Sequence, residues 1–339
     1  MRRSLVLSLV LCLKFAVSAE ATPIVISPGA SLAANAAALG AFNRAATTIG
    51  SMFTDPILVT VNADLQALGS PNVIGQTQSV LLQGGYTTIR NAMVADAANE
   101  ADDAIVAALP TIAQFSATVL TGSSFTGNML GTKANLKALG FAGLDGTFGA
   151  SDGQIIFNTG FGFDYDNSDG VGGGLVDFET VALHELLHLL GFFSVVDLLD
   201  GTAPGAISFS TLDMYRFGAA LTPTTVAQFT NNPRNFVPGA AANTSDAVNA
   251  WAMSTGLVSG DGRQASHWKD DALTGVRIGV MDPTLAPGVF YGLTAADIRA
   301  LDLIGWDNVA AVPEPATLVL LGSGLVALAW RRKRGRPIA

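Results

Sequence analysis

Cysteine, histidine and charged residues are all scarce in this chain of 339 residues. The single cysteine, Cys12, lies near the N-terminus, which excludes a disulfide framework, a cysteine nucleophile and a cysteine-bound zinc site in the main body. Charged residues make up only 13%, and the net charge of −9 argues against nucleic acid as the main partner. Hydrophobic residues reach 49%, which excludes a disordered acidic chain and is enough for a substantial core.

Residues 1–21 have the pattern of a secretory signal peptide. Arg2 and Arg3 precede an apolar run over residues 5–13, and small residues suited to cleavage follow. We therefore predict that the protein is exported and that its main body covers residues 22–311. A lipid anchor at Cys12 and a buried N-terminal helix are the alternatives.

Residues 312–339 combine three features in a fixed order. The motif Pro313-Glu314-Pro315 precedes an apolar run over 316–330 and a basic cluster over 331–334. The run is short for a membrane span, which needs about 20 residues, and the basic cluster would stay on the cytoplasmic side. This ending resembles the PEP-CTERM sorting signal of Gram-negative bacteria. The resemblance implies a short membrane segment that retains the protein, then processing by a sorting enzyme and release to the cell surface or the extracellular space; a permanent anchor is the alternative.

Helical and strand patterns alternate in the first half of the body, whereas the second half has weak periodicity. This order predicts an α+β fold with two lobes, at about residues 22–191 and 192–311, of which the second is irregular and ends in a helix. The predicted helices cover 31–53, 86–109 and 177–190, and a last one begins at 294. Asp177 is the predicted N-cap of the third helix and Gly191 its predicted end, and Thr294 and Asp297 are a predicted capping box. The predicted strands cover 56–61, 73–82 and 153–157, and the irregular stretch covers 200–265.

The segment His184-Glu185-Leu186-Leu187-His188 lies within the predicted helix over 177–190. Residues four apart share one helix face, so both imidazoles can reach one zinc ion. Glu185 can then face the fourth coordination position and accept a proton from water there. The helix is apolar nearly all round, which predicts that it is buried, and burying these polar groups is costly without a metal or other partners. The alternative is an ordinary helix with two surface histidines.

A catalytic zinc needs a third protein ligand. No glutamate lies between Glu185 and Glu314, which nearly excludes the class with a glutamate on a later helix. In the pattern H-E-x-x-H-x-x-G-x-x-H, Gly191 is in place but Ser194 stands at the last position, where serine is a poor ligand. The remaining candidate ligands are His267, Asp197 and Asp213.

The sequence around this helix and beyond it resembles the metzincin zinc proteases, in the layout of the leishmanolysin-like branch. In that layout H-E-x-x-H-x-L-G-F precedes a long insert, a histidine often followed by tryptophan, and M-x-P. Here these elements are residues 184–192, His267-Trp268 and Met281-Asp282-Pro283, and the resemblance covers roughly residues 150–305. It implies an N-terminal lobe with a twisted mixed sheet and a zinc site of His184, His188 and His267, with Glu185 as general base and Met281 as the Met-turn. Asp197, nine residues past His188, is the fallback third ligand apart from this resemblance.

Together these features predict an exported zinc endopeptidase that acts on proteins or peptides. The strand at Gln154–Phe157 is the predicted rim along which an extended peptide pairs. Two other functions stay open: a catalytically inactive surface or extracellular-matrix protein that keeps the metzincin fold, and a zinc hydrolase for a non-peptide bond.

Two weaker patterns lie outside this zinc motif. Tyr215 and Tyr291 are candidate donors to a developing oxyanion. An acidic loop loosely resembles a calcium loop, but its spacing departs from that pattern and a solvated loop is the better interpretation. The residues of this loop are Asp164, Asp166, Ser168, Asp169 and Gly170.

Overall fold

The structure is a computed structural model that describes residues 21–100 and 103–309. The predicted signal peptide, apart from its last residue, and the predicted sorting segment lie outside these ranges. Within them, no helix is both long and apolar enough to span a membrane.

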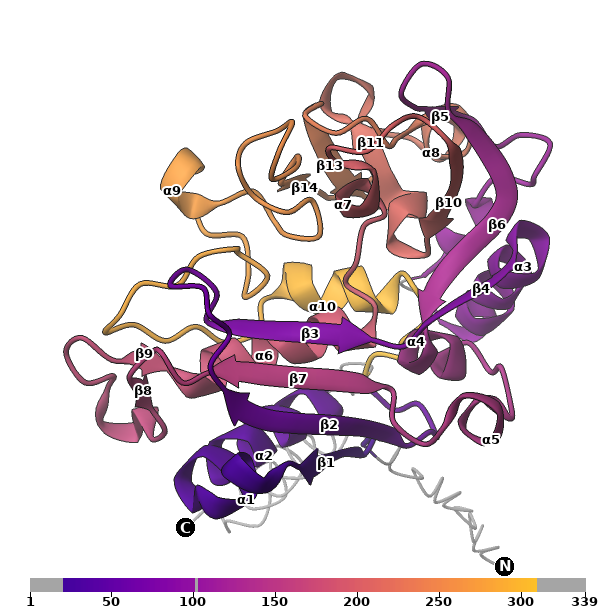
Figure 1. The fold of residues 1–339 in the computed structure, drawn as a ribbon. Coiled ribbons are helices and arrows are strands. Elements are labelled where there is room, and N and C mark those ends of the chain that lie inside the picture. The colour runs from indigo at the N-terminus through magenta and orange to yellow at the C-terminus, as the bar shows by residue number, and fades with distance from the viewer. Residues whose placement is uncertain (1–20, 101–102, 310–339) are drawn as a thin grey trace, which may run out of the picture.

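A four-stranded mixed sheet forms one layer of the molecule (Figure 1). β1 (Ile24–Pro28), β2 (Val59–Gln66) and β7 (Gly153–Asn158) run parallel, and β3 (Gly75–Ser79) pairs antiparallel with β7 at one edge. Alternate residues of β2 are buried, as the two-residue period of a strand with one core face requires. The strand predicted over 153–157 is confirmed, but its role as a rim is wrong, because β2 and β3 already pair with both of its edges. The edge strands of this sheet are β1 and β3.

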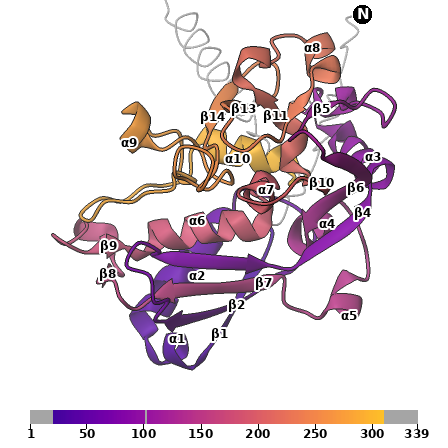
Figure 2. The same cartoon turned by 45° about the horizontal axis from the view of Figure 1, so that its top comes forward.

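Two helices cover the core face of this sheet. α2 (Ala36–Gly50) packs against α6 (Phe178–Leu190), and both contact the strands. Phe42 of α2 lies edge-on to Phe157 of β7, with ring centroids 5.1 Å apart, and Phe178 lies 4.3 Å from Phe157. Figure 2 shows α6 between the sheet and the half of the molecule formed by the later part of the chain.

The helix predicted over 31–53 is in fact two helices. α1 (Ala30–Ala34) ends before Asn35, whose side chain accepts a hydrogen bond from the backbone N–H of Ala38 and so caps α2. Helical periodicity continues across the break, and for this reason the sequence pattern did not reveal it.

Both ends of α6 agree with the sequence prediction. The Asp177 carboxylate accepts the backbone N–H of Thr180 at 2.7 Å, which caps the first turn. Gly191 ends the helix with φ of 124°, and a Cβ there would lie 2.8 Å from Cδ1 of Ile304. Only glycine satisfies both conditions, so the chain turns sharply three residues after the second histidine of the motif.

The predicted last helix is also confirmed. α10 (Ala295–Asp302) begins with a capping box between Thr294 and Asp297. It packs its buried residues, Ala300 and Leu301 among them, into the core beside α6.

Residues 200–265 are not irregular, contrary to the prediction. They supply four strands of a five-stranded sheet with the order β14-β13-β11-β12-β5. Each strand is only two to four residues long, and several bury polar side chains such as Arg234 and Thr244, so no apolar alternation marks them. The strands are β5 (Ala117–Thr118), β11 (Arg216–Gly218), β12 (Arg234–Asn235), β13 (Ala242–Ser245) and β14 (Ala250–Met253).

A third sheet joins the two halves of the chain. β6 (Ser124–Thr132) pairs with β4 (Leu81–Gly85) from the first half and with β10 (Ala206–Ser210) from the second. Phe115 stacks on Phe209 at 4.6 Å between ring centroids. Sheet hydrogen bonds and core packing therefore cross the lobe boundary expected near residue 191.

The other predicted elements are displaced or shortened. The strand predicted over 73–82 is two strands, β3 and β4, and the one predicted over 56–61 is β2, which starts at Val59. The helix predicted over 86–109 stops at Asp96. The remaining elements are α3 (Tyr86–Asp96), η1 (Ala97–Asn99), η2 (Val106–Ala108), α4 (Lys133–Ala138), α5 (Leu144–Phe148), β8 (Phe163–Asp164), η3 (Asn167–Asp169), β9 (Val176–Asp177), α7 (Val196–Leu199), η4 (Leu212–Tyr215), η5 (Ala219–Leu221), α8 (Val226–Asn231) and α9 (Asp271–Thr274).

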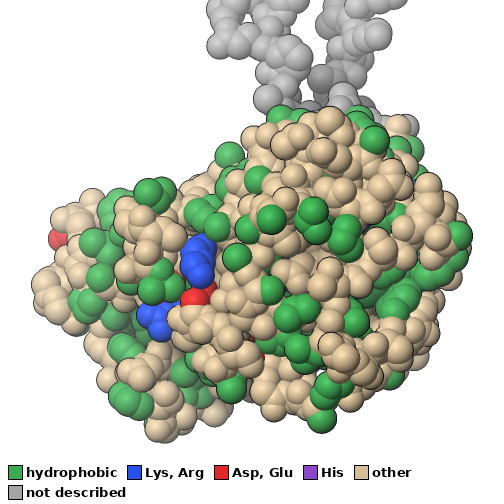
Figure 3. Space-filling view, turned by 90° about the horizontal axis from the view of Figure 1, so that it is seen from above, with side chains coloured by type: hydrophobic (Ala, Val, Ile, Leu, Met, Phe, Trp, Pro, Cys, Tyr) green, Lys and Arg blue, Asp and Glu red, His purple; other side chains and the backbone are tan. Residues whose placement is uncertain are grey.

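Charged side chains are sparse on the face seen in Figure 3, where a small group of basic and acidic side chains lies among hydrophobic and uncharged polar ones. This distribution follows from a composition with only 13% charged residues. Many of the carboxyl groups are instead buried.

Several carboxyl groups gather where the end of α3 meets the end of α10. Burial, followed by the charge of Asp307, raises the pKa of Asp55 to about 7. Burial and neighbouring carboxylates raise the pKa of Asp96 to about 8 and that of Glu100 to about 9. Arg299 contributes a positive charge beside this group. At neutral pH the folded protein therefore holds protons on Asp96 and Glu100 and part of a proton on Asp55.

The raised pKa values of Asp55, Asp96 and Glu100 make the free energy of unfolding depend on pH. A raised pKa in the folded state gives stability that is complete below the unfolded pKa, near 4, and is lost as the pH rises through the folded values of about 7 to 9. We expect a lower unfolding temperature at pH 9 than at pH 6 at constant ionic strength, measured by scanning calorimetry. Asp96→Asn should reduce this difference, and an identical pH profile for wild type and variant would contradict the assignment.

Candidate metal centre

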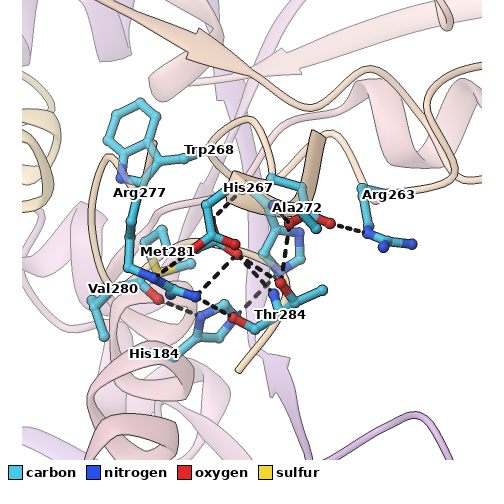
Figure 4. Close-up of polar contacts among 12 residues, drawn as sticks. His184, Arg263, His267, Trp268, Ala272, Arg277, Val280, Met281 and Thr284 are labelled. Carbon is cyan, nitrogen blue, oxygen red and sulfur yellow. Dashed lines mark hydrogen bonds and ion pairs between the residues drawn. The ribbon is translucent and has the colours of Figure 1, made fainter. Parts of the chain in front are cut away.

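The three histidines of the body meet at one point. His184 and His188 lie one turn apart on α6, and His267 lies in the segment between β14 and α9. The Nε2 atom of His267 is 3.1 Å from Nε2 of His184 and 3.3 Å from Nε2 of His188, although 79 positions separate the last pair. Figure 4 shows His184 and His267 turned toward each other. The sequence-predicted ligand set is therefore brought together by the fold.

The second nitrogen of each ring fixes its orientation. Every Nδ1 atom faces a backbone carbonyl oxygen, which can only accept, so Nδ1 carries the hydrogen and Nε2 presents a lone pair. Burial lowers the pKa of all three histidines to about 3, which keeps them neutral at physiological pH. The contacts are His184 Nδ1 to Val280 O at 2.8 Å, His188 Nδ1 to Phe192 O at 2.8 Å and His267 Nδ1 to Gln264 O at 3.1 Å.

Three lone pairs that face one another with no shared proton need an electrophile between them. Zinc binds imidazole nitrogen at about 2.0–2.1 Å, so tetrahedral coordination separates two such nitrogens by about 3.3 Å. The Nε2 separations of 3.1 and 3.3 Å agree with that value. The residues thus fit a tetrahedral zinc ion with a fourth position left for water or substrate.

Glu185 lies on α6 beneath the edge strand β3. Its side chain is only 6% exposed, and Thr77 Oγ1 lies 2.7 Å from its Oε2. Burial raises the pKa of Glu185 to about 7, although the Thr77 hydrogen bond opposes the shift. A Cβ at Gly75 would lie 2.6 Å from Glu185 Oε1, so glycine leaves room for the carboxylate at this close approach. Ser79 Oγ donates to the carbonyl of His188 at 3.3 Å, which also holds β3 to the helix.

Asp297 holds the Met281 segment next to the histidines. Its fully buried carboxylate accepts the backbone N–H of Val280 at 2.9 Å and the indole N–H of Trp268 at 2.8 Å. Val280 supplies the carbonyl that orients His184, and Trp268 follows His267 directly. The sequence identified Asp297 only as a helix cap, so its second role was missed.

Further contacts join the Met281 segment to the residues after His267. The Trp268 backbone N–H donates to the carbonyl of Met281 at 3.0 Å, and Thr284 Oγ1 donates to Asp270 at 3.0 Å. Asp270, Asp271 and Asp282 lie close enough together to share a metal ion, but Arg263 and Arg277 form ion pairs with them (Figure 4). These carboxylates therefore have their charge partners within the protein.

The two aspartates considered as third ligands have other partners. The Asp197 carboxylate accepts the backbone N–H groups of Ala265 and Ser266, and Asp213 accepts Ser194 Oγ at 2.7 Å. Neither carboxylate belongs to the histidine cluster among the described residues. Ser194, at the position of the missing histidine in the shorter pattern, is buried against Asp213 and does not face the cluster.

The two candidate tyrosines and the acidic loop lie in different environments. Tyr215 is buried, and its hydroxyl donates to the carbonyl of Leu303 at 2.5 Å, so it is not an oxyanion donor. Tyr291 packs its ring over the guanidinium of Arg277, 3.9 Å from the ring centroid. In the predicted acidic loop, Asp164 accepts the backbone N–H groups of Asp166 and Gly172, and the described part of the loop brings no three acidic side chains together.

Asp297→Asn tests the support beneath the histidines. The change removes a charge and one acceptor where several N–H groups converge, so we expect a loss of about 2–3 kcal/mol in the free energy of unfolding, measured with urea on metal-free protein. Asp166→Asn, at an exposed loop position, is the control and should leave the unfolding midpoint unchanged. Equal midpoints for both variants would show that Asp297 does not support the segment.

Comparison with known proteins identifies the C-terminal signal. Residues 311–334 match the family model of the PEP-CTERM protein-sorting motif, which agrees with the predicted segment 312–339. No curated protein and no solved structure matches the chain. The protein is therefore an exported protein with a C-terminal sorting signal that a sorting enzyme recognises.

Proposed function

We propose that this protein is an exported zinc-dependent endopeptidase of metzincin type. The observation that carries the proposal is the convergence of three neutral imidazole Nε2 atoms, two of them from the helix that also carries the buried Glu185. In the proposed site His184, His188 and His267 hold the ion. When bound, zinc supplies Lewis acidity toward water and toward the scissile carbonyl group.

Glu185 is the proton carrier in this proposal. Its carboxylate accepts a proton from the attacking water and returns it to the departing amine, which is the usual work of a general base followed by a general acid. A pKa of about 7 suits both steps near neutral pH. Thr77 fixes the position of the carboxylate through its 2.7 Å contact to Oε2.

The free edge of β3 is the proposed binding site for an extended peptide. In the four-stranded sheet β3 pairs only with β7, so one edge has unpaired backbone groups that can add a peptide strand. Thr77 and Ser79 fasten this strand to α6, which places a bound peptide beside Glu185 and the histidines. Backbone pairing of this kind favours peptides over other substrates.

The C-terminal signal bears on where the enzyme acts. We propose that the apolar run over 316–330 retains the protein at the membrane until the sorting enzyme processes it near Pro313-Glu314-Pro315. The released product would act at the cell surface or in the extracellular space.

Glu185→Gln separates proton transfer from metal binding. The change removes the base but no imidazole, so we expect at least about a hundredfold lower casein hydrolysis with about one zinc per chain retained. The two measurements are a casein assay and metal analysis of the full-length protein. Glu179→Gln is the matched control on the same helix, where Glu179 pairs with Arg44, and it should hydrolyse casein at the wild-type rate.

Three other outcomes would decide against the proposal. Full casein hydrolysis by Glu185→Gln would refute the role of the base. A zinc-loaded wild type without hydrolysis would favour the inactive matrix protein. A zinc-loaded wild type that cleaves small ester or amide substrates but no peptide would favour a hydrolase for non-peptide bonds.

A further inference from the structure

The segment that carries His267 is fastened to the molecule by one carboxylate. Asp197 of α7 accepts the backbone N–H of Ala265 at 2.5 Å and that of Ser266 at 2.9 Å, and it also accepts Ser266 Oγ. Three donors from the two residues directly before His267 therefore surround this carboxylate. Hydrogen bonds to a carboxylate are among the stronger ones in proteins.

The same two residues are also held from their other side. Ser194 donates its backbone N–H to Ser266 Oγ at 2.9 Å, and Arg216 donates to the carbonyl of Ala265 at 3.2 Å. Ser194 belongs to the stretch that follows α6, so this contact connects the segment before His267 to the chain just beyond His188. The backbone before His267 is thus fixed on both sides relative to the helix.

We propose that Asp197 is a positioning residue, which sets the place of His267 Nε2 before a metal ion binds. The inference rests on the proposed zinc site. His184 and His188 are held in register by their helix, but His267 comes from a loop, and ordering loop residues during binding costs conformational entropy. Because the hydrogen bonds to Asp197 form when the protein folds, the loop before His267 is already ordered when a metal ion binds. Its two carboxylate oxygens face the loop backbone, which leaves the histidines as the direct ligands.

Asp200 offers a matched comparison at the end of the same short helix. Its carboxylate accepts the backbone N–H groups of Val258 at 2.6 Å and Ser259 at 2.9 Å. It therefore fastens another part of the same insert in a similar way, but the part that it fastens carries no imidazole. If the two aspartates only stabilise the insert, substituting either one should weaken zinc binding. If Asp197 positions His267, only the substitution of Asp197 should weaken it.

The experiment compares Asp197→Asn and Asp200→Asn in the full chain. Zinc affinity is measured by competition with a chromophoric chelator, and thermal unfolding is measured on the metal-free proteins. We expect Asp197→Asn to bind zinc about 10- to 100-fold more weakly than wild type, the usual effect of removing a group that orients a ligand. Asp200→Asn should bind zinc with wild-type affinity.

Cobalt(II) absorption separates a positioning residue from a ligand. At saturating cobalt, Asp197→Asn should give the wild-type spectrum, because the donor atoms are unchanged. A different spectrum would make Asp197 a ligand and overturn the inference. Ser266→Ala serves where Asp197→Asn does not fold: it removes the hydroxyl contacts but keeps both backbone N–H bonds, and it should weaken zinc binding while leaving the cobalt spectrum unchanged.

The inference is overturned by wild-type zinc affinity in Asp197→Asn, by wild-type affinity in Ser266→Ala, or by an equal loss in Asp200→Asn. Each of these results would leave the proposed zinc site intact, because wild type still binds the metal. Absence of zinc binding by wild type would instead refute the proposed function together with this inference.

Discussion

The interior of this protein depends on one costly arrangement, a buried imidazole and two half-buried ones, all neutral, in which Nε2 of His267 lies 3.1 and 3.3 Å from Nε2 of His184 and His188. Buried polar groups without partners destabilise a fold. Here each Nδ1 has a carbonyl partner, and in the proposed site the three Nε2 atoms bind a shared ion. The elements around the three histidines hold their rings in these orientations.

Three neighbouring parts of the fold serve this arrangement. The cap at Asp177 and the turn at Gly191 set the length of α6, so that His188 comes at its last turn. Asp297 of α10 holds the segment that orients His184, and Asp197 holds the segment before His267. Two aspartates, the buried Asp297 and the half-buried Asp197, thus hold these segments through hydrogen bonds to backbone N–H groups.

The sequence predicted those features that depend on local chemistry. Helix α6, its cap, its end at Gly191 and the capping box of α10 all follow from the type and spacing of neighbouring residues. The convergence of His267 with His184 and His188 was expected from a family layout and the small number of histidines, and the structure places the three together. In each case a few side chains with strong local preferences carry the information.

Features that depend on distant partners could not be predicted in this way. The strands over 200–265 are very short and bury residues such as Arg234, so their partners define them more than their own pattern does. The sequence of β7 likewise does not reveal that the strand pairs with β2 along one edge and with β3 along the other. Asp197 resembles a possible ligand in the sequence, and only the position of Ala265 and Ser266 reveals that its oxygens face a loop backbone.

The central claim is that the three histidines form one zinc site, and the most direct measurement is a zinc titration of full-length wild type, His188→Ala and His267→Ala. The account predicts about one tightly bound zinc per chain in wild type and a similarly severe loss of affinity in both variants, because two imidazoles alone make a weak site. Wild-type zinc affinity in His267→Ala would contradict it, since the third nitrogen would then contribute nothing to the site.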